Sequence, residues 1–435
     1  MAERGSYKPG VAGSIPAGRT LDLSSAVTPL PDSITIDNFG PVPVHCPATA
    51  IELGELVRSH AAVYPRGGGT HSHIGGVPAK PGIILDLTAM NRIIDYPARD
   101  MTVTLQAGAS LGQLGQLLKS ENQWLPIDVP NPDAATVGGS MAVNANGPRR
   151  LAQGTWRDAV IGIRFVSDDG IESKGGGRVV KNVAGYDLMK LHTGALGTLG
   201  IITEVTLKVK PRTEASSFVV FGVPSSAVGP TLDRLHASIS RPVAIELLNR
   251  AAVKRLGVPL PDAEPWLIAC GFEEKAATVA WQIAALKDES KGSPLRDLAV
   301  TEGEIAAKLW LALTALQAGG DDFSTLKFDT RPSAVASLAL KADAGDSRAV
   351  VHAHAGNGIV FVHVANEPTP ERLSTLVADL LSDRREDNLQ ILRCPGEWKS
   401  RLPVWGRDRG DRMLMATVRA ALDPRGIFNP GRVAW

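Results

Sequence analysis

The stretch 64–76, with the sequence YPRGGGTHSHIGG, constrains the fold of this chain more than any other feature. It holds three consecutive glycines between a helix-like segment, 50–61, and a strand-like run, 82–87. Glycine accepts positive φ and has no Cβ, so this backbone can curl closely around a ligand. Successive N–H groups in such a loop form a concave anion site, to which Arg66 adds a cationic donor. The pattern predicts a diphosphate site, and a mobile surface loop is the alternative.

Length and composition indicate a globular protein of several domains, and the charge balance argues against some binding partners. At 435 residues the chain is too long for one small core, so two or more domains are expected. Hydrophobic residues make up 44% and charged residues 21%, which is typical of a globular protein in water. The 46 Lys and Arg residues balance 45 Asp and Glu residues, which argues against a nucleic-acid partner and against an acidic membrane surface.

Cysteine usage and hydropathy exclude further classes. Cys46, Cys270 and Cys394 lie far apart and form no Cys-x-x-Cys pair. This spacing argues against a disulfide scaffold and against an iron–sulfur cluster on this chain, and we predict no metal site. No run approaches the roughly 18 apolar residues of a membrane span, and the N-terminus lacks the apolar core of a signal peptide. The sequence therefore predicts a cytoplasmic protein without a direct membrane span.

Two further glycine-rich stretches follow in the chain. In the stretch 128–147, Pro130 extends the backbone, and Gly138 and Gly139 allow a tight turn into a helix of small residues. Small side chains over so many positions indicate a flat ligand or another backbone close by, and tight helix–sheet contact is the alternative. The stretch 194–209 begins GALGTLG, and its last ten residues alternate like a strand that ends at Pro211.

Changes in composition and in hydrophobic pattern along the sequence divide the chain into three parts. Residues 1–42 are rich in Gly, Pro and Ser and predict a loosely ordered N-terminal arm. Residues 43–213 carry the glycine-rich stretches, separated by short helices and strands. From 214 to 435 amphipathic helices and strands alternate, which predicts an α+β domain with helices on one face of an antiparallel sheet.

Two histidines form a candidate catalytic pair in this last part. His352 and His354 are two residues apart in a strand-like run, so they share one face, and Gly356-Asn-Gly358 predicts a hairpin turn. Two adjacent imidazoles can bind a metal or a substrate carboxylate, or act as acid and base. Two polar residues on a solvated sheet face are the alternative interpretation.

Three motifs in order resemble one known family: PRGGGTH at 65–71, TVGG at 136–139 and GALGTLGII at 194–202. They are similar to the FAD-binding domain of the vanillyl-alcohol oxidase and p-cresol methylhydroxylase family. The resemblance covers about 43–213. It implies a two-subdomain α/β domain that clasps an extended FAD, followed by a C-terminal α+β cap domain whose tail returns to the FAD domain.

The resemblance also implies the cofactor-binding residues. The first loop would hold the diphosphate, the second stretch would flank the flavin, and the third would close the cleft through its backbone. Thr70 takes the place of the reactive histidine in relatives with covalent flavin, and strand-like alternation points His71 elsewhere, which implies non-covalent FAD. The residues expected to bind FAD are Arg66, Gly67, Gly68, Gly69, Thr70, His71, Ser72, Pro130, Thr136, Gly138, Gly139, Asn144, Gly147, Gly197, Gly200, Ile201 and Ile202.

Within the family, KNVAGYDL at 181–188 and LDPRGIFNPGR at 422–432 are most similar to the FAD-binding E subunits of bacterial glycolate oxidases. The resemblance implies a complex with a second flavoprotein subunit and an iron–sulfur subunit, held in the cytoplasm or, through its partners, at the inner membrane. It implies oxidation of a small 2-hydroxy acid, with His352 and His354 as catalytic residues. A non-catalytic FAD-holding subunit and a stand-alone oxidase of another 2-hydroxy acid or a sugar lactone remain alternatives.

Overall fold

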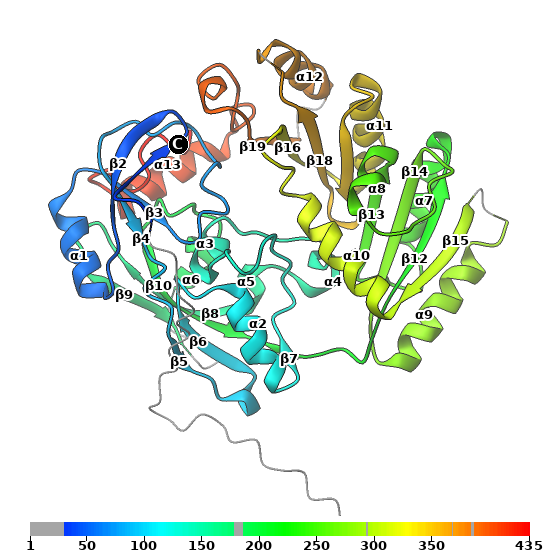
Figure 1. Cartoon of the computed structure of the whole chain (residues 1–435), viewed down its shortest axis with the longest axis horizontal. Helices are drawn as coiled ribbons and strands as arrows, with labels where there is room; N and C mark the ends of the chain where they lie inside the picture. Colours follow the sequence, from blue (N-terminus) through cyan, green and yellow to red (C-terminus); the bar gives the residue numbers. More distant parts are fainter. Residues whose placement is uncertain (1–29, 178–185, 293–294, 368, 384–386) are drawn as a thin grey trace, which may run out of the picture.

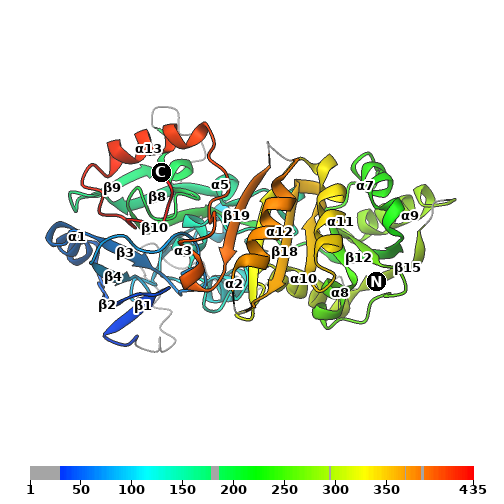
Figure 2. The ribbon, with the colours of Figure 1, turned by 90° about the horizontal axis from the view of Figure 1, so that it is seen from above.

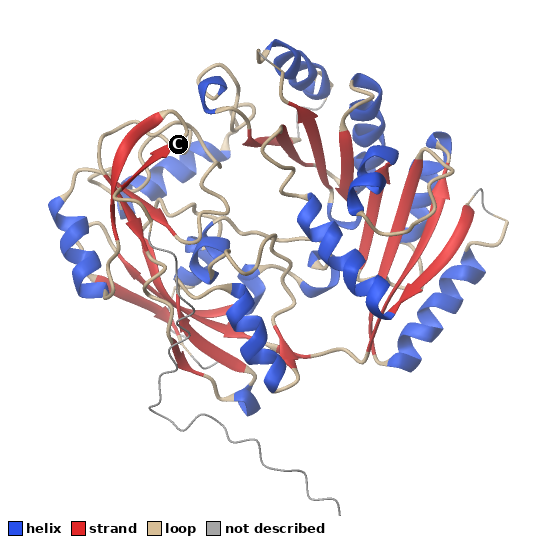
Figure 3. Ribbon diagram, viewed as in Figure 1, coloured by secondary structure: helices blue, strands red, loops and turns tan. Residues whose placement is uncertain are grey.

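The computed structural model describes residues 30–177, 186–292, 295–367, 369–383 and 387–435. The chain forms two lobes, which Figure 1 shows side by side, and both combine helices with sheets, as Figure 3 shows by secondary structure. The first lobe contains two sheets. The second lobe is organised around one large sheet. Of the 181–188 motif, only 186–188 lie within the described residues.

The first sheet of the first lobe is mostly parallel and carries the first glycine loop at its edge. Its order is β1 (Ser33–Ile36), β2 (Phe39–His45), β4 (Ile83–Asp86) and β3 (Val63–Arg66). β3 and β4 are parallel, and helix α1 (Ala50–Ser59) connects β2 to β3. Thr49 caps α1 by accepting from the Glu52 N–H at 3.2 Å, and the Glu52 carboxylate accepts from the Ala48 N–H. This confirms the predicted start of that helix.

The second sheet of the first lobe is antiparallel and carries the other glycine stretches. Its order is β5 (Ile93–Asp95), β6 (Thr102–Gln106), β10 (Ile201–Lys208), β8 (Val160–Val166) and β9 (Glu172–Gly176), and β7 (Gln123–Trp124) pairs with β11 (Lys210–Pro211). Around it lie α2 (Leu111–Ser120), α3 (Val137–Ala142), α4 (Arg150–Gln153), α5 (Trp156–Ala159), α6 (Leu188–His192) and the 3-10 turn η1 (Ala98–Asp100).

The second lobe is an eight-stranded antiparallel sheet. Its order is β15 (Arg296–Glu302), β12 (Ala215–Val223), β14 (Trp266–Glu274), β13 (Ala244–Asn249), β17 (Val350–His354), β18 (Ile359–Ala365), β16 (Phe323–Asp329) and β19 (Asn388–Arg393). Four helices pack on one face: α7 (Val228–His236), α9 (Ala276–Glu289), α11 (Val335–Gly345) and α12 (Glu371–Leu381). Short 3-10 turns are η2 (Ser225–Ala227), η3 (Pro332–Ala334), η4 (Ala355–Asn357) and η5 (Gly396–Trp398).

Helices cover both faces of this sheet, so the expectation of helices on one face is wrong. α8 (Arg250–Leu256) and α10 (Gly303–Leu316) bury a second apolar cluster on the face toward the first lobe, as Figure 1 shows. The sequence pattern misses this because the two faces of a sheet cannot be told apart from helix periodicity alone.

The C-terminal segment lies on the first lobe from α13 (Asp411–Leu422) onward, and Figure 2 shows this helix beside β8 and β9. Phe428 is fully buried in a cluster with Val63 and Ile201, so it joins the two sheets of that lobe. The Val63 N–H donates to Ile427 O at 2.8 Å, and the Asn429 N–H donates to Val63 O at 3.0 Å. The tail is thereby an additional strand-like neighbour of β3.

One local expectation differs from the structure. Residues from Ser33 onward, part of the expected loose arm, form β1 and β2. Antiparallel pairing between these two strands orders this part of the chain, which composition alone does not reveal.

Candidate functional site

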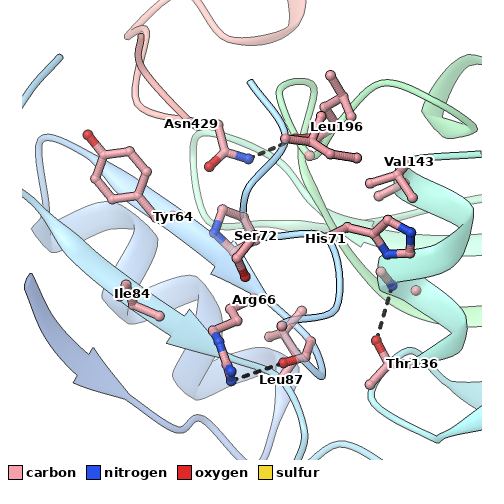
Figure 4. A pocket seen from close by; sticks show the side chains of 18 of the residues that line it. Tyr64, Arg66, His71, Ser72, Ile84, Leu87, Thr136, Val143, Leu196 and Asn429 are labelled. Carbon is pink, nitrogen blue, oxygen red and sulfur yellow. Dashed lines mark hydrogen bonds between the residues drawn. The ribbon is translucent and has the colours of Figure 1, made fainter. Parts of the chain in front are cut away.

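A cavity of about 310 Å³ lies in the first lobe between the glycine loop, α3 and the start of β10. Figure 4 shows Arg66 and Ser72 on one side and Thr136 and Val143 on the other, with Asn429 of the tail above them. The size lies in the range of small-molecule sites, about 300–1,000 Å³. All three glycine-rich stretches therefore contribute to one hollow.

Most of the residues expected to bind FAD line this cavity. They are Arg66, Gly67, Gly68, Gly69, Thr70, His71, Ser72, Thr136, Gly138, Gly139, Gly197, Gly200, Ile201 and Ile202. Pro130, Asn144 and Gly147 are not among the residues that line it. Gly147 lies against Asp128 and Gln317, and Asn144 has a left-handed φ of 51°. These three positions therefore lie outside the cavity wall.

Several lining residues were missed by sequence reasoning. The N-terminal strand provides Ile34, Thr35, Ile36 and Asp37, the glycine loop continues to His73 and Ile74, and the tail provides Asn429 and Arg432. The Asn429 Nδ2 donates to Leu196 O at 2.7 Å, which ties the tail to the third glycine stretch. A usable signal existed for the tail alone, since its Asn-Pro-Gly-Arg ending belongs to the quoted motif at 422–432.

The glycines of the first loop are required by contact with the second subdomain. A Cβ at Gly67 would overlap the Thr136 side chain, and a Cβ at Gly68 would overlap the carbonyl group of Ala134. Gly69 has a φ of 75°, a conformation that L side chains rarely adopt. The loop thus packs closely against residues 134–136. This contact is possible because Gly67 and Gly68 have no Cβ atoms.

Polar groups around the loop are held by hydrogen bonds to residues nearby in the sequence and by one long ion pair. Thr136 caps α3 by accepting from the Gly139 N–H at 3.2 Å. The Arg66 Nη1 donates to Gly67 O at 3.2 Å and lies 3.9 Å from the Asp86 carboxylate. Because this ion pair is long, the Arg66 guanidinium retains capacity for an anionic ligand in the cavity.

Two imidazoles extend along the loop toward the second lobe. The rings of His71 and His73 stack with centroids 6.3 Å apart, and the Thr70 Oγ1 lies 3.0 Å from the His71 Nδ1. Burial, followed by the charge of Arg393, lowers the pKa of His71 to about 4 and that of His73 to about 2. Both rings are therefore neutral at physiological pH. The strand-like alternation that would point His71 elsewhere does not occur, because the chain turns here and His71 lines the cavity wall.

The candidate catalytic histidines lie outside the cavity, on the face of the second sheet that looks toward the first lobe. His352 and His354 are 0% and 2% exposed, and their ring centroids are 6.0 Å apart. The His354 Nδ1 lies 2.7 Å from the Glu246 carboxylate, whereas neither ring nitrogen of His352 has a hydrogen-bond partner among the described residues. His352 stacks instead against both Phe361 and His363, at centroid distances of 4.7 and 5.2 Å.

The first lobe closes over this histidine face. α4 contacts both β13 and η4, and Leu151 of α4 packs on Gly356, next to the end of β17. Beside it, Arg149 binds Asp128 and forms a two-bond pair with Glu273 of the second lobe, at 2.7 and 2.8 Å. Within the described part of the chain, no group of His, Cys, Asp or Glu residues is arranged to hold a metal ion.

Comparisons with known proteins agree with the geometry of this site. Residues 43–174 match the family described as FAD binding domain, and residues 406–433 match the C-terminal domain of FAD linked oxidases. The chain is 27% identical to the glycolate oxidase subunit GlcD of Bacillus subtilis over 395 residues, covering 85% of this chain and 83% of that protein. It is 40% identical to the GlcE subunit of Escherichia coli over 136 residues, covering 31% of this chain and 39% of that protein.

Among solved structures, p-cresol methylhydroxylase with bound substrate superposes with a TM-score of 0.67 at 14% identity, over 89% of this chain and 88% of that one. This likeness shows that the two proteins share a fold. None of the helices in the described ranges is both long and apolar enough to cross a membrane. The chain thus has a p-cresol methylhydroxylase-type fold, carries two segments that match an FAD binding domain and the C-terminal domain of FAD linked oxidases, and is an oxidoreductase whose cofactor is FAD.

Proposed function

We propose that this chain is the FAD-binding subunit of a glycolate oxidase-like complex that oxidises a small 2-hydroxy acid, with glycolate the first candidate. The observation that carries the proposal is the cavity, in which the three glycine-rich stretches and the tail meet. Two curated relatives named as glycolate oxidase subunits support the choice of substrate class. In this proposal the chain works in a complex with a partner flavoprotein and an iron–sulfur subunit, in the cytoplasm or at the inner membrane.

The loop 66–72 then holds the FAD diphosphate, with Arg66 as the cation and Thr70 and Ser72 as hydroxyl donors. The segment from Thr136 to Gly139 flanks the ring, and the backbone at 197–202 closes the other side. Bound FAD would accept the electrons of the substrate C–H bond, while the chain's own residues bind, orient and exclude water. Thr70 in place of a reactive histidine supports a non-covalent cofactor.

An anionic substrate also needs a cation beside the cavity. Arg393 on β19 contacts the cavity wall, because its Nη2 lies 3.2 Å from the Nδ1 of His73. Its other partner is Asp321, whose side chain is 94% exposed and compensates the charge weakly. Arg393 is therefore a candidate partner for the carboxylate of a 2-hydroxy acid.

The catalytic assignment of His352 and His354 remains a prediction. Both are enclosed, and a general base must come within hydrogen-bond reach of the proton that it removes. This enclosure favours a second candidate function, a subunit that holds FAD while a partner oxidises the acid. A stand-alone oxidase of another 2-hydroxy acid or a sugar lactone would need a different base.

The experiment is anaerobic mixing of the purified chain with glycolate, D-lactate and D-2-hydroxyglutarate while the flavin absorbance is followed. Acid precipitation of the same sample should release the yellow cofactor into the supernatant, and a yellow pellet would contradict non-covalent binding. Bleaching by glycolate supports the proposal. If the FAD-loaded chain is bleached by no acid and shows no turnover with an artificial electron acceptor, the FAD-holding function stands instead.

A further inference from the structure

Four carbonyl oxygens in the loop segment 72–76 accept hydrogen bonds from cations that come from distant parts of the chain. Arg432 of the tail donates to the carbonyls of Ser72, Ile74 and Gly76, the last two at 2.5 and 2.7 Å. Lys399 of the second lobe donates to the carbonyl of His73 at 2.6 Å. The side chains of Arg432 and Lys399 thus donate hydrogen bonds to four carbonyl oxygens within five consecutive residues of the loop.

A buried carboxylate fixes both cations in place. The Asp37 Oδ1 lies 2.7 Å from the Lys399 Nζ, and the Asp37 Oδ2 lies 2.6 Å from the Arg432 Nη1. The three side chains are at most 9% exposed, so each charge depends on the others for compensation. Asp37 comes from the N-terminal strand region, Lys399 from the segment after β19 and Arg432 from the tail. Three separate segments are therefore joined at the back of one loop.

The tail backbone reinforces the same junction. The Gly76 N–H donates to Arg432 O and the Ala79 N–H donates to Pro430 O, both at 2.9 Å. Gly431 has a φ of 86°, and a Cβ there would overlap Val77 and Ala79. The tail is consequently shaped to lie against 76–79, and Arg432 reaches the loop from a fixed backbone.

The electrostatic consequence concerns the diphosphate of FAD. Backbone carbonyls carry partial negative charge, and a loop that binds an anion must direct that charge away from the ligand or neutralise it. Because the guanidinium of Arg432 donates to three of these oxygens, the peptide planes between residues 72 and 77 are held in one orientation. Arg432 and Asp37 also line the cavity, so the positive field of the guanidinium extends into it.

We propose that Arg432 positions the glycine-rich loop for the diphosphate of FAD, so that the C-terminal tail is an obligatory part of the cofactor site. Without the guanidinium, the carbonyls of 72–76 lose their partners and the loop can turn negative dipoles toward the diphosphate. The inference depends on the cofactor and not on which acid is oxidised.

The test compares Arg432→Met with a matched tail variant, Arg419→Met. Arg419 also donates two bonds to tail carbonyls, of Trp435 and Phe428 at 2.8 and 2.9 Å, and neither bond involves the loop. FAD is titrated into the full-length apo-protein, and the dissociation constant and the thermal midpoint of the apo-protein are measured. Arg432→Met should weaken FAD binding by about 10- to 100-fold, the scale of losing hydrogen bonds to a charged group. Arg419→Met should stay within about 3-fold of wild type.

The outcomes separate positioning from general stability. Arg432→Lys keeps the ion pair with Asp37 and should recover part of the affinity, which also serves if the methionine variant does not fold. Supporting results are weakened FAD binding in Arg432→Met at an apo-protein midpoint similar to that of Arg419→Met. Equal weakening in both variants, or an unchanged dissociation constant in Arg432→Met and Arg432→Lys, would overturn the proposal. Flavin bleaching by 2-hydroxy acids is measured separately and tests the proposed function alone.

Discussion

The glycine-loop region and the histidine face of the second lobe both bury polar side chains. The two regions differ in whether these buried groups have hydrogen-bond or ion-pair partners. Around the loop, Asp37 lies between Lys399 and Arg432, and the carbonyls behind the loop have cationic partners. On the histidine face, Glu246 and His354 form one pair, but within the described residues His352 has no partner for either ring nitrogen, and the second Glu246 oxygen is also unpaired.

The presence or absence of partners for buried polar groups distinguishes a binding surface from an enclosed polar cluster. Paired charges beside a cavity keep one side of the loop available to a ligand. Unpaired nitrogens inside a closed interface cost free energy, since a buried donor or acceptor without a partner loses its hydration. Burial, together with the nearby imidazoles, lowers the pKa of His352 well below its ordinary value, and burial raises the pKa of Glu246.

The largest effect is expected at Gly68. Gly68→Ala places a Cβ into the Ala134 carbonyl, so the loop must move away from the second subdomain, and no FAD should copurify with the variant. Gly115→Ala is the matched control, because no described atom lies within 4 Å of a Cβ there and the position is in helix α2. This control should keep its FAD and gain about 0.5–1 kcal/mol of stability. Flavin content per chain and urea denaturation measure both results.

Next in size is His354→Ala, which leaves the buried Glu246 carboxylate without its partner. Breaking such a pair typically costs about 3–5 kcal/mol, and we expect the free energy of unfolding to fall by that amount. A second change, Glu246→Gln in the same chain, should recover part of the loss because it removes the unpaired charge.

The same variant tests the catalytic prediction at matched FAD occupancy. A general base would be revealed by flavin bleaching at least about 100-fold slower in His354→Ala, with unchanged FAD content. Equal bleaching rates in the two proteins would assign the pair a structural role, in keeping with its enclosure.

A moderate effect is expected from pH on the apo-protein. The folded state keeps His71 neutral down to pH about 4 and His73 to about 2, whereas the unfolded chain binds protons near 6.5. The unfolded state therefore binds more protons below pH 6.5, so stability falls as the pH drops from about 6.5 toward 4. The raised pKa of Glu246 acts in the opposite direction. Denaturation at about pH 7 and about pH 5 measures the net change, and greater stability at the lower pH would contradict the prediction.

The smallest effect is expected from His352→Phe. The ring stacks on Phe361 with an interplanar angle of 6°, and a phenyl ring of similar shape can keep that contact. Because both imidazole nitrogens lack partners in the described part of the chain, their removal should leave stability unchanged or raise it by up to about 1 kcal/mol. The gain should be larger at about pH 5 than at about pH 8, since the variant has no proton to bind at this position. A large loss of stability would indicate that ordered water satisfies those nitrogens.

Local sequence patterns determined the parts of this protein that depend on neighbouring residues. The helix that begins at residue 50 and the strand at the end of the third glycine stretch each arise within about ten residues, and the structure has both, as α1 and β10. The glycines indicated a close approach of the backbone to a ligand or to another backbone, and the resemblance of the three motifs to a known family implied an FAD fold. The paired face of His352 and His354 follows from strand alternation alone.

Tertiary structure decided which of these residues meet. Gly68 is constrained by Ala134, and the back of the loop is held by Asp37 and Arg432, which are separated by 395 positions in the chain. The enclosure of His354 depends on α4, which packs on the second lobe across the domain junction. The spacing of residues along a strand determines which face of the sheet each side chain points to. The exposure of that side chain depends on which other parts of the chain cover this face. For this physical reason the sequence alone indicated a cofactor site but could not separate its lining from a polar cluster that the fold encloses.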